Sequence, residues 1–289
     1  MSKTHSETSW RKLRLGGHER DYLIHIPSSA PVQNRALVLG FHGSASSAAH
    51  FVEFSGLTEV GDDEGFISVI PQGLGPDRLR RSWNAGGCCR WAFKENIDDI
   101  AFVSTIISSV IDEFGVDPNR IFATGMSNGG MMAYRLALEL SDRITAVASV
   151  AGPMSLIQAT PSRPLSVCHF HGTLDEYTPF LGGVGKRSTS KTNFPSAAAS
   201  VEAWRRFNGC DEQFVEEALP TIIEDGTQVT RRTWSGGRNG SLVILYTIDG
   251  MGHTWPGRKT RLTHLGPMTA NICASRTMWE FFNRVTPRK

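Results

Sequence analysis

The chain has 289 residues, 40% of them hydrophobic, and a formal net charge of +2. This size and composition suit one large α/β domain with a substantial core. The balanced, scattered charge excludes the basic footprint of a nucleic-acid-binding protein or of one that binds an anionic membrane, and no apolar run is long enough to span a bilayer.

The N-terminal residues and the number of cysteines indicate in which cellular compartment we expect the protein. Residues 1–9 are polar and mixed in charge, so we expect them to be flexible and to contain no secretory signal. The five cysteines are odd in number and lack zinc-type spacing, which argues against a disulfide framework and a structural metal site. We therefore expect a cytoplasmic protein that needs no metal or other cofactor, and the sequence leaves its oligomeric state open.

Two cysteines are adjacent, at Cys88 and Cys89. Consecutive Cα atoms lie about 3.8 Å apart, which is less than the roughly 4.4 Å at which disulfides usually begin. We therefore expect at least one of the two to be a packed thiol or to pair elsewhere.

In chain order, two strand-like runs first flank Gly16-Gly17, a pattern typical of an antiparallel hairpin. Buried-type apolar runs then alternate with helical segments, which predicts a mostly parallel central sheet with helices on both faces, in a single domain over residues 1–289. The last expected helix directly follows Pro267, which is placed where a first-turn proline is tolerated. The expected strands include residues 11–15, 22–26, 36–41, 66–70, 144–151, 165–170 and 242–248, and the expected helices include residues 98–114, 196–207 and 268–285.

Between these elements, residues 121–140 combine a strand, a sharp turn and a helix in immediate succession. The turn reads Gly125-Met126-Ser127-Asn128-Gly129. A turn this tight leaves no room for side chains two residues before and after the serine, so glycines stand there. This is the context of a nucleophile elbow, and Ser127 is its candidate nucleophile.

Three other expected strands also end in polar residues. They are followed by His42-Gly43-Ser44, by His171-Gly172-Thr173-Leu174-Asp175, and by Asp249-Gly250-Met251-Gly252-His253. Reactive groups gather at the carboxyl ends of parallel strands. The chain order of serine, acid and histidine is the one expected of the α/β-hydrolase fold.

These strand ends suggest roles for single side chains. His253 is the candidate base because its flanking glycines let its loop turn back over the sheet edge, whereas His171 more plausibly braces the acid loop. Asp175 is the candidate acid that orients the imidazole, with Asp249 as the alternative.

An oxyanion intermediate needs aimed donors as well. The backbone N–H groups of Ser44 and Asn128 are the candidates.

The chain resembles a known family through six motifs taken together. They are G-F-H-G-S at 40–44, S-W-N-A-G-G-C-C at 82–89, D-D-I-A-F at 98–102, G-M-S-N-G-G at 125–130, H-G-T-L-D at 171–175 and G-H-T-W-P-G at 252–257. The chain is similar to the polyhydroxybutyrate depolymerase and feruloyl esterase group of α/β-hydrolases, and in particular to LpqC-like single-domain esterases.

The resemblance implies the same three residues as a catalytic triad, Ser127, Asp175 and His253. It also implies a pocket bordered by Trp83, Asn84 and Trp255. Members of the group are commonly exported, carry disulfides and, when they degrade solid polymer, carry a binding module. This chain shows none of these signs, which argues against action on solid polymer.

Together these observations predict a serine ester hydrolase that works through an acyl-enzyme. The expected substrates are small or oligomeric esters, with feruloyl or other aryl esters and acetylated sugars favoured and hydroxyalkanoate oligomers as the alternative. Two alternatives belong to other functional classes. One is an acyltransferase or peptidase on the same fold, and the other is a binding protein that has this fold but no turnover.

Overall fold

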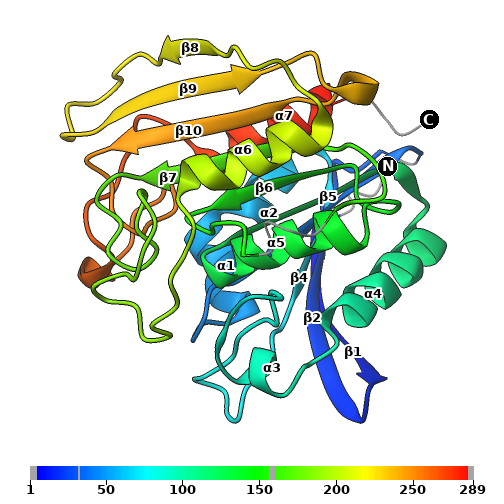
Figure 1. The fold of residues 1–289 in the computed structure, drawn as a ribbon. Coiled ribbons are helices and arrows are strands. Elements are labelled where there is room, and N and C mark those ends of the chain that lie inside the picture. Colours follow the sequence, from blue (N-terminus) through cyan, green and yellow to red (C-terminus); the bar gives the residue numbers. More distant parts are fainter. Residues whose placement is uncertain (1–4, 32, 156–159, 286–289) are drawn as a thin grey trace.

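A computed structural model describes residues 5–31, 33–155 and 160–285 of the chain (Figure 1). In this part of the chain ten strands form one sheet in the order β1-β2-β4-β3-β5-β6-β7-β10-β9-β8. Of the described helices, none has the length and apolar character that crossing a membrane requires.

The strands are β1 (Glu7–Leu15), β2 (His18–Ile26), β3 (Arg35–Phe41), β4 (Ile67–Pro71), β5 (Val116–Met126), β6 (Ala146–Val150), β7 (Ser166–Gly172), β8 (Val215–Ala218), β9 (Gln228–Trp234) and β10 (Val243–Asp249). The α-helices are α1 (Ala48–Ser55), α2 (Leu57–Glu64), α3 (Arg90–Lys94), α4 (Asp99–Phe114), α5 (Asn128–Glu139), α6 (Ala197–Asn208) and α7 (Ala274–Arg284), and two short 3₁₀ turns cover Arg238–Gly240 and Thr263–Leu265.

The centre of the sheet is parallel and its two edges are antiparallel. Strands β4, β3, β5, β6, β7 and β10 pair in parallel, whereas β1 and β2 at one edge and β9 and β8 at the other pair antiparallel. Parallel central strands place their carboxyl ends at one edge of the sheet. The predicted mostly parallel sheet of an α/β-hydrolase fold is therefore confirmed for the centre, with antiparallel extensions on both sides.

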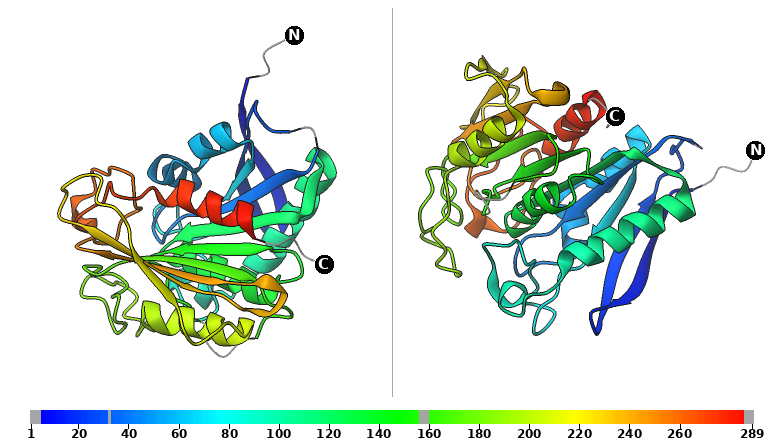
Figure 2. Two further views of the ribbon diagram at one scale, coloured as in Figure 1. Left: turned by 90° about the horizontal axis from the view of Figure 1, so that it is seen from above. Right: turned by 45° about the vertical axis from the view of Figure 1, so that its right-hand side comes forward.

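The core has two layers, one on each face of the sheet. Along β3 the side chains of Leu37 and Leu39 pack on one face, with α4, α5 and α6, while Ala36 and Val38 pack on the other face, with α1, α2 and α7. Because successive residues of a strand point to opposite faces, a strand covered on both sides is a continuous apolar run. Figure 2 shows α6 and α7 on opposite faces of the sheet.

Several predicted elements end where their capping residues indicate. The hairpin turns at Gly16-Gly17, with Leu15 opposite His18. Helix α4 begins after Asp98, whose carboxylate accepts a hydrogen bond from the Ala101 N–H at 2.9 Å. A capping oxygen satisfies one of the helix N–H groups that lack an intrahelical acceptor.

The last helix is shorter than predicted. It begins at Ala274 and not at residue 268, so Pro267 lies outside it. The residues before it form a loop that packs on the His253 loop, because the Gly252 N–H donates to the Pro267 carbonyl and the Ala274 N–H to the Pro256 carbonyl. These long-range hydrogen bonds replace the helix that the apolar spacing predicts.

The sequence pattern also misses elements at the sheet edges. Residues 7–9, expected to be flexible, are the first residues of β1, and residues 1–4 lie outside the described part. Strands β8 and β9 and helix α3 were not predicted. Strand β8 is exposed along its whole length. It pairs with β9 through the backbone, and its side chains face those of β9 in ion pairs, so it lacks the apolar run used to find the other strands.

Candidate active site

The turn between β5 and α5 has the conformation of a nucleophile elbow. Ser127 has φ 55° and ψ −121°, a strained backbone conformation for a residue with a side chain. A Cβ at Gly125 would overlap the backbone of Gly129, and a Cβ at Gly129 would overlap the Phe41 carbonyl. The steric reason given above for these two glycines is thus visible in the structure.

Ser127 lines a cavity of about 480 Å³ at the carboxyl edge of the parallel strands. The same cavity is lined by His253, Ser44 and Asn128. Asn128 is the first residue of α5, and the first N–H groups of a helix have no intrahelical acceptor. The structure therefore brings the candidate nucleophile, base and oxyanion donors together around one space.

Behind the cavity, the imidazole of His253 is held by Asp175. Nδ1 of His253 lies 2.6 Å from Oδ2 of Asp175, and both side chains are buried. Oδ1 of Asp175 accepts hydrogen bonds from the N–H groups of Tyr177 and Thr178 at 2.8 and 2.9 Å. The second nitrogen of the imidazole, Nε2, thus remains available to groups in the cavity.

The alternative acid, Asp249, lies apart from this pair. Its carboxylate accepts a hydrogen bond from the Thr173 hydroxyl at 2.8 Å, in an exposed position, and Asp249 is not among the residues lining the cavity. Within the described part of the chain no hydrogen bond joins Ser127 Oγ to His253, a contact that in related chemistry often tightens only when substrate binds.

The environment of Asp175 keeps it ionised. Burial alone would raise the pKa of its carboxyl, but the charge of His253 and hydrogen bonds from His171 and His253 outweigh burial and lower it well below the usual range. A carboxylate that is negative throughout the neutral range can both fix the imidazole tautomer and stabilise the imidazolium.

A buried row of hydrogen bonds reaches this acid from the far side. Nε2 of His171 lies 2.7 Å from the Thr178 carbonyl and 3.5 Å from Asp175 Oδ2. Because a carbonyl only accepts, Nε2 of His171 is a donor and its Nδ1 accepts from His169 at 2.9 Å. The other nitrogen of His169 lies 2.7 Å from the Tyr134 hydroxyl.

His171 therefore braces the acid loop, as the sequence suggests. His169 and His171 are two residues apart in β7 and so lie on the same face of that strand. This spacing could have predicted the row of hydrogen-bonded side chains from the sequence.

The two loops that contain the candidate oxyanion donors are joined by Trp83. Its indole N–H donates to the His42 carbonyl at 2.9 Å, and its backbone N–H donates to the Asn128 side-chain oxygen at 2.7 Å. The Asn128 side-chain amide donates back to the Trp83 carbonyl at 3.1 Å. One buried residue thus links the loop of Ser44 to the first turn of α5.

His42, just before Ser44, is buried and neutral. Its Nδ1 lies 2.7 Å from the Gly43 carbonyl, and its Nε2 accepts from the Gly73 N–H at 3.0 Å. Burial lowers the pKa of His42 to about 4. These bonds fix one tautomer and hold the loop, so His42 supports the backbone of this loop from within the core.

Trp83, Asn84 and Trp255 do not border the cavity, contrary to the sequence-based expectation. All three are buried and none lines the cavity. The polar groups of the tryptophans are satisfied inside the protein, in the case of Trp255 by the Ser275 hydroxyl at 3.1 Å. The Asn84 N–H donates to Asp99, which forms a buried ion pair with Arg20 at 2.6 Å.

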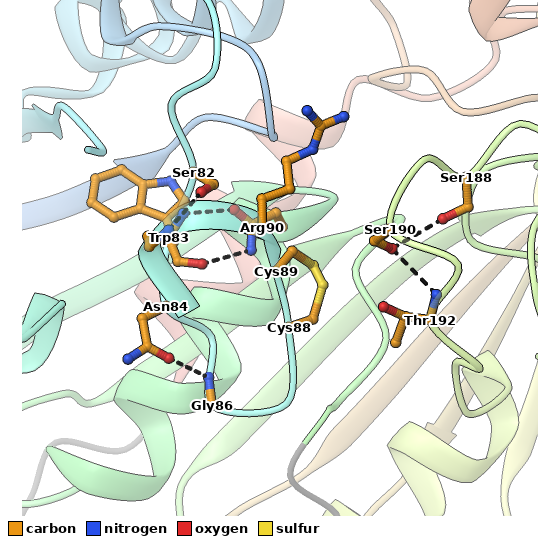
Figure 3. The surroundings of a disulfide bond; sticks show 12 residues. Ser82, Trp83, Asn84, Gly86, Cys88, Cys89, Arg90, Ser188, Ser190 and Thr192 are labelled. Atoms are coloured by element: carbon orange, nitrogen blue, oxygen red, sulfur yellow. Dashed lines mark hydrogen bonds between the residues drawn. A yellow bond between two sulfur atoms is a disulfide. The ribbon is translucent and has the colours of Figure 1, made fainter. Parts of the chain in front are cut away.

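The cavity wall contains residues that the sequence did not single out. Tyr177 packs over His253 with ring centroids 5.0 Å apart. Figure 3 shows the loop of Cys88, Cys89 and Arg90 beside the loop of residues 188–192. Both loops reach the cavity, and the Arg90 guanidinium donates to the Thr189 hydroxyl.

The expectation that Cys88 or Cys89 would be a packed thiol or pair elsewhere is wrong. The two are disulfide-bonded to each other across a cis peptide, with Cα atoms 3.1 Å apart. The spacing of about 3.8 Å between consecutive Cα atoms applies to a trans peptide only.

Comparison with known proteins agrees with this geometry. Residues 92–201 match a family of phospholipases and carboxylesterases. The chain is 33% identical over 263 residues to a putative esterase, NocK, from Nocardia uniformis subsp. tsuyamanensis, an alignment that covers 86% of this chain and 74% of that protein.

The chain is 27% identical to feruloyl esterase B from Piromyces equi. That alignment covers 81% of this chain but only 42% of that protein. The solved acetyl xylan esterase from Aspergillus awamori has the same fold, with a TM-score of 0.64 at 15% identity over 95% of this chain and 99% of that one. The chain therefore belongs to the polyhydroxybutyrate depolymerase and feruloyl esterase group of α/β-hydrolases, a family of carboxylic-ester hydrolases.

Proposed function

We propose that this chain hydrolyses small or oligomeric carboxylic esters through an acyl-enzyme on Ser127. The observation that carries the proposal is the 2.6 Å hydrogen bond between His253 and Asp175 at the wall of the cavity that Ser127 lines. A serine hydroxyl is a weak nucleophile at neutral pH unless an adjacent base removes its proton. In the proposed single catalytic domain, the loop after β10 supplies this base and the loop after β7 supplies its orienting acid.

In the first half of the reaction, Ser127 Oγ attacks the ester carbonyl while His253 Nε2 takes the hydroxyl proton. The negative oxygen that forms is stabilised by the backbone N–H groups of Asn128 and Ser44. The imidazolium then gives its proton to the departing alcohol oxygen, which leaves the acyl group on Ser127.

The second half repeats these steps with water. His253 removes a proton from water, the resulting hydroxide attacks the acyl carbonyl, and the same N–H groups hold the negative oxygen again. Collapse of this intermediate returns the proton to Ser127 and releases the carboxylic acid. Asp175 keeps the imidazole in one tautomer throughout and stabilises its charged form.

The cavity suits an ester with a ring or a short chain. Its volume of about 480 Å³ is within the range of small-molecule sites, roughly 300 to 1,000 Å³. Its aromatic wall consists of Phe51, Phe54, Tyr177 and Phe194, which replaces the two tryptophans as the support for an aryl group. Feruloyl or other aryl esters and acetylated sugars remain our first proposal, with hydroxyalkanoate oligomers second.

The first test is hydrolysis of p-nitrophenyl acetate and butyrate by wild type and Ser127→Ala. We expect kcat to fall on the order of 10⁴-fold or more, because the nucleophile is lost. Ser109→Ala, on the exposed side of α4, is the matched control and should keep full activity. Full activity in Ser127→Ala would refute the proposal. Relative kcat/KM values of the wild type for methyl ferulate, acetylated xylo-oligomer and hydroxybutyrate trimer would rank the three ester classes.

A further inference from the structure

The charged side chains that line the cavity are of one sign. Arg78 and Arg90 reach it from the loop after β4 and from the start of α3, while no aspartate or glutamate of the described chain lines it. The other titratable side chains in the wall are His50, His253, His264, Tyr177 and Cys89, of which Cys89 is held in the disulfide. A ligand in this cavity thus meets two guanidinium groups and no carboxylate at its wall.

Neither arginine is neutralised by a carboxylate of the described residues. No ion pair within this part of the chain includes Arg78 or Arg90, whereas Arg80, which does not line the cavity, pairs with Asp77 at 2.6 Å. Burial is the main cause that lowers the pKa of the nearby Arg81; the charge of Arg78 adds to this effect, and the charge of Asp21 opposes it. The two guanidinium groups at this wall therefore have no carboxylate partner among the described residues.

Arg90 is oriented by a neighbouring loop. Its backbone has φ 59°, and its guanidinium donates a hydrogen bond to the Thr189 hydroxyl across the cavity wall. A single hydroxyl uses one of the five N–H donors of a guanidinium and none of its charge. A held guanidinium with free donors matches the two oxygens of a carboxylate, and a concave wall of one sign concentrates ligands of the opposite sign.

We propose that the cavity selects esters that carry a carboxylate elsewhere in the molecule, and that Arg90, assisted by Arg78, binds this carboxylate. The inference rests on the proposed ester hydrolysis and adds the charge of the substrate to it. Half-esters of dicarboxylic acids, hydroxy-acid oligomers with a free acid end, and esters of hydroxybenzoates all have this chemistry. The first two carry the charge on the acyl side or at a chain end, and the third on the alcohol side.

Two matched substrate pairs test the proposal with the purified full chain. Mono-4-nitrophenyl adipate is compared with its neutral amide, 4-nitrophenyl adipamate, for a charge on the acyl side. The butyrate ester of 4-hydroxybenzoate is compared with that of 4-hydroxybenzamide for a charge on the alcohol side. We expect kcat/KM to favour the carboxylate on the order of tenfold in at least one pair, mainly through KM, because a charge-assisted hydrogen bond is gained.

The ratio within a pair, and not the absolute rate, is then measured in variants. Arg90→Gln and Arg78→Gln should each reduce the ratio, and the double variant should bring it close to one. Arg80→Gln removes a neighbouring guanidinium that is already paired, and should keep the wild-type ratio. Raising the salt concentration should also lower the wild-type ratio, since the arginines are partly exposed and their charge is screened.

Three outcomes separate the two proposals. Equal kcat/KM within both pairs, or a preference for the carboxylate that survives in the double variant, would overturn the proposed anion site. Hydrolysis of the neutral esters would still support the esterase proposal in either case. Absence of turnover of all four esters by folded wild-type protein would instead overturn the proposed function. If Arg90→Gln does not fold, Arg78→Gln alone still tests the anion site. The side chain of Arg78 is exposed, so its replacement should not disturb folding.

Discussion

At the scale of single residues, the structure separates two carboxylates that the sequence left as alternatives. Asp175 is buried and bonded to His253, whereas Asp249 is exposed and bonded to Thr173. Both follow a strand, so position in the sequence could not distinguish them. The decision depends on how two loops fold back toward each other, which is a tertiary property.

The corresponding prediction concerns Asp175→Asn. An amide in this place would favour the wrong imidazole tautomer, so we expect kcat for p-nitrophenyl butyrate to fall about 10⁴-fold. Asp249→Asn is the control and should stay within about twofold of wild type, because Asp249 touches neither His253 nor the cavity. The reverse order of the two effects would show that the acid is misassigned.

Trp83→Phe tests the link between the two loops that contain the candidate oxyanion donors. The substitution removes the indole N–H that bonds the His42 carbonyl, together with part of the ring volume, so the loop of Ser44 loses a support. We expect kcat to fall roughly tenfold, less than the roughly 10² to 10³ lost when an oxyanion donor is removed outright.

Trp255→Phe is the matched control for this variant, since its indole N–H bonds Ser275 away from the cavity. Both variants should lose unfolding free energy, about 1 to 3 kcal/mol through an unpaired buried acceptor and a further amount through the space that the smaller ring leaves. Only Trp83→Phe should lose turnover, and an equal loss in both would indicate a merely structural role for Trp83.

At the scale of elements, the elbow depends on contacts between β3, β5 and α5. Gly129→Ala would place a methyl group against the Phe41 carbonyl of β3. Because backbone cannot move aside as a side chain can, we expect a loss of about 3 kcal/mol of unfolding free energy. Chemical denaturation would measure it.

Gly43→Ala is the comparison, because a Cβ there would meet its nearest atoms at 3.5 and 3.6 Å, ordinary contact distances. It should cost much less stability than Gly129→Ala. A Gly129→Ala protein as stable as wild type would contradict the steric argument for the elbow.

What the sequence could predict at this scale follows from burial. The central strands and the polar residues at their ends were predictable, because strands covered on both faces are continuous apolar runs. Strand β8 was not, because it pairs with β9 through its backbone while its exposed side chains form ion pairs such as Glu217–Arg231 at 2.5 Å in place of an apolar run. The burial of Trp83 and Trp255 was not predictable either. The sequence does not show whether the ring of a loop tryptophan lines a cavity or fills the core.

At the scale of the whole molecule, buried neutral histidines make stability depend on pH. The pKa of His42 is lowered to about 4 by burial, from an ordinary value of 6.5. Between these values the unfolded chain binds a proton that the folded protein does not, so stability is full above pH 6.5 and is lost as pH falls toward 4. His169, whose pKa burial also lowers, acts in the same direction.

We therefore expect the unfolding free energy to be at least about 2 kcal/mol lower at pH 5 than at pH 7. Denaturant titrations at both pH values measure the difference. His42→Gln should reduce it, whereas His18→Gln, in an exposed position, should leave it unchanged. Equal stability at the two pH values in wild type would contradict the buried, neutral state of His42.

The row from Tyr134 through His169 and His171 has one more consequence. With the Tyr134 hydroxyl donating to His169, every hydrogen bond in the row has the same direction and ends at the loop of Asp175. Their dipoles add, so neutral groups present a partial positive charge to the carboxylate. Buried dipoles are hardly screened by ions. The proposed acid is thus supported by a field set by the fold, independent of the salt that surrounds the protein.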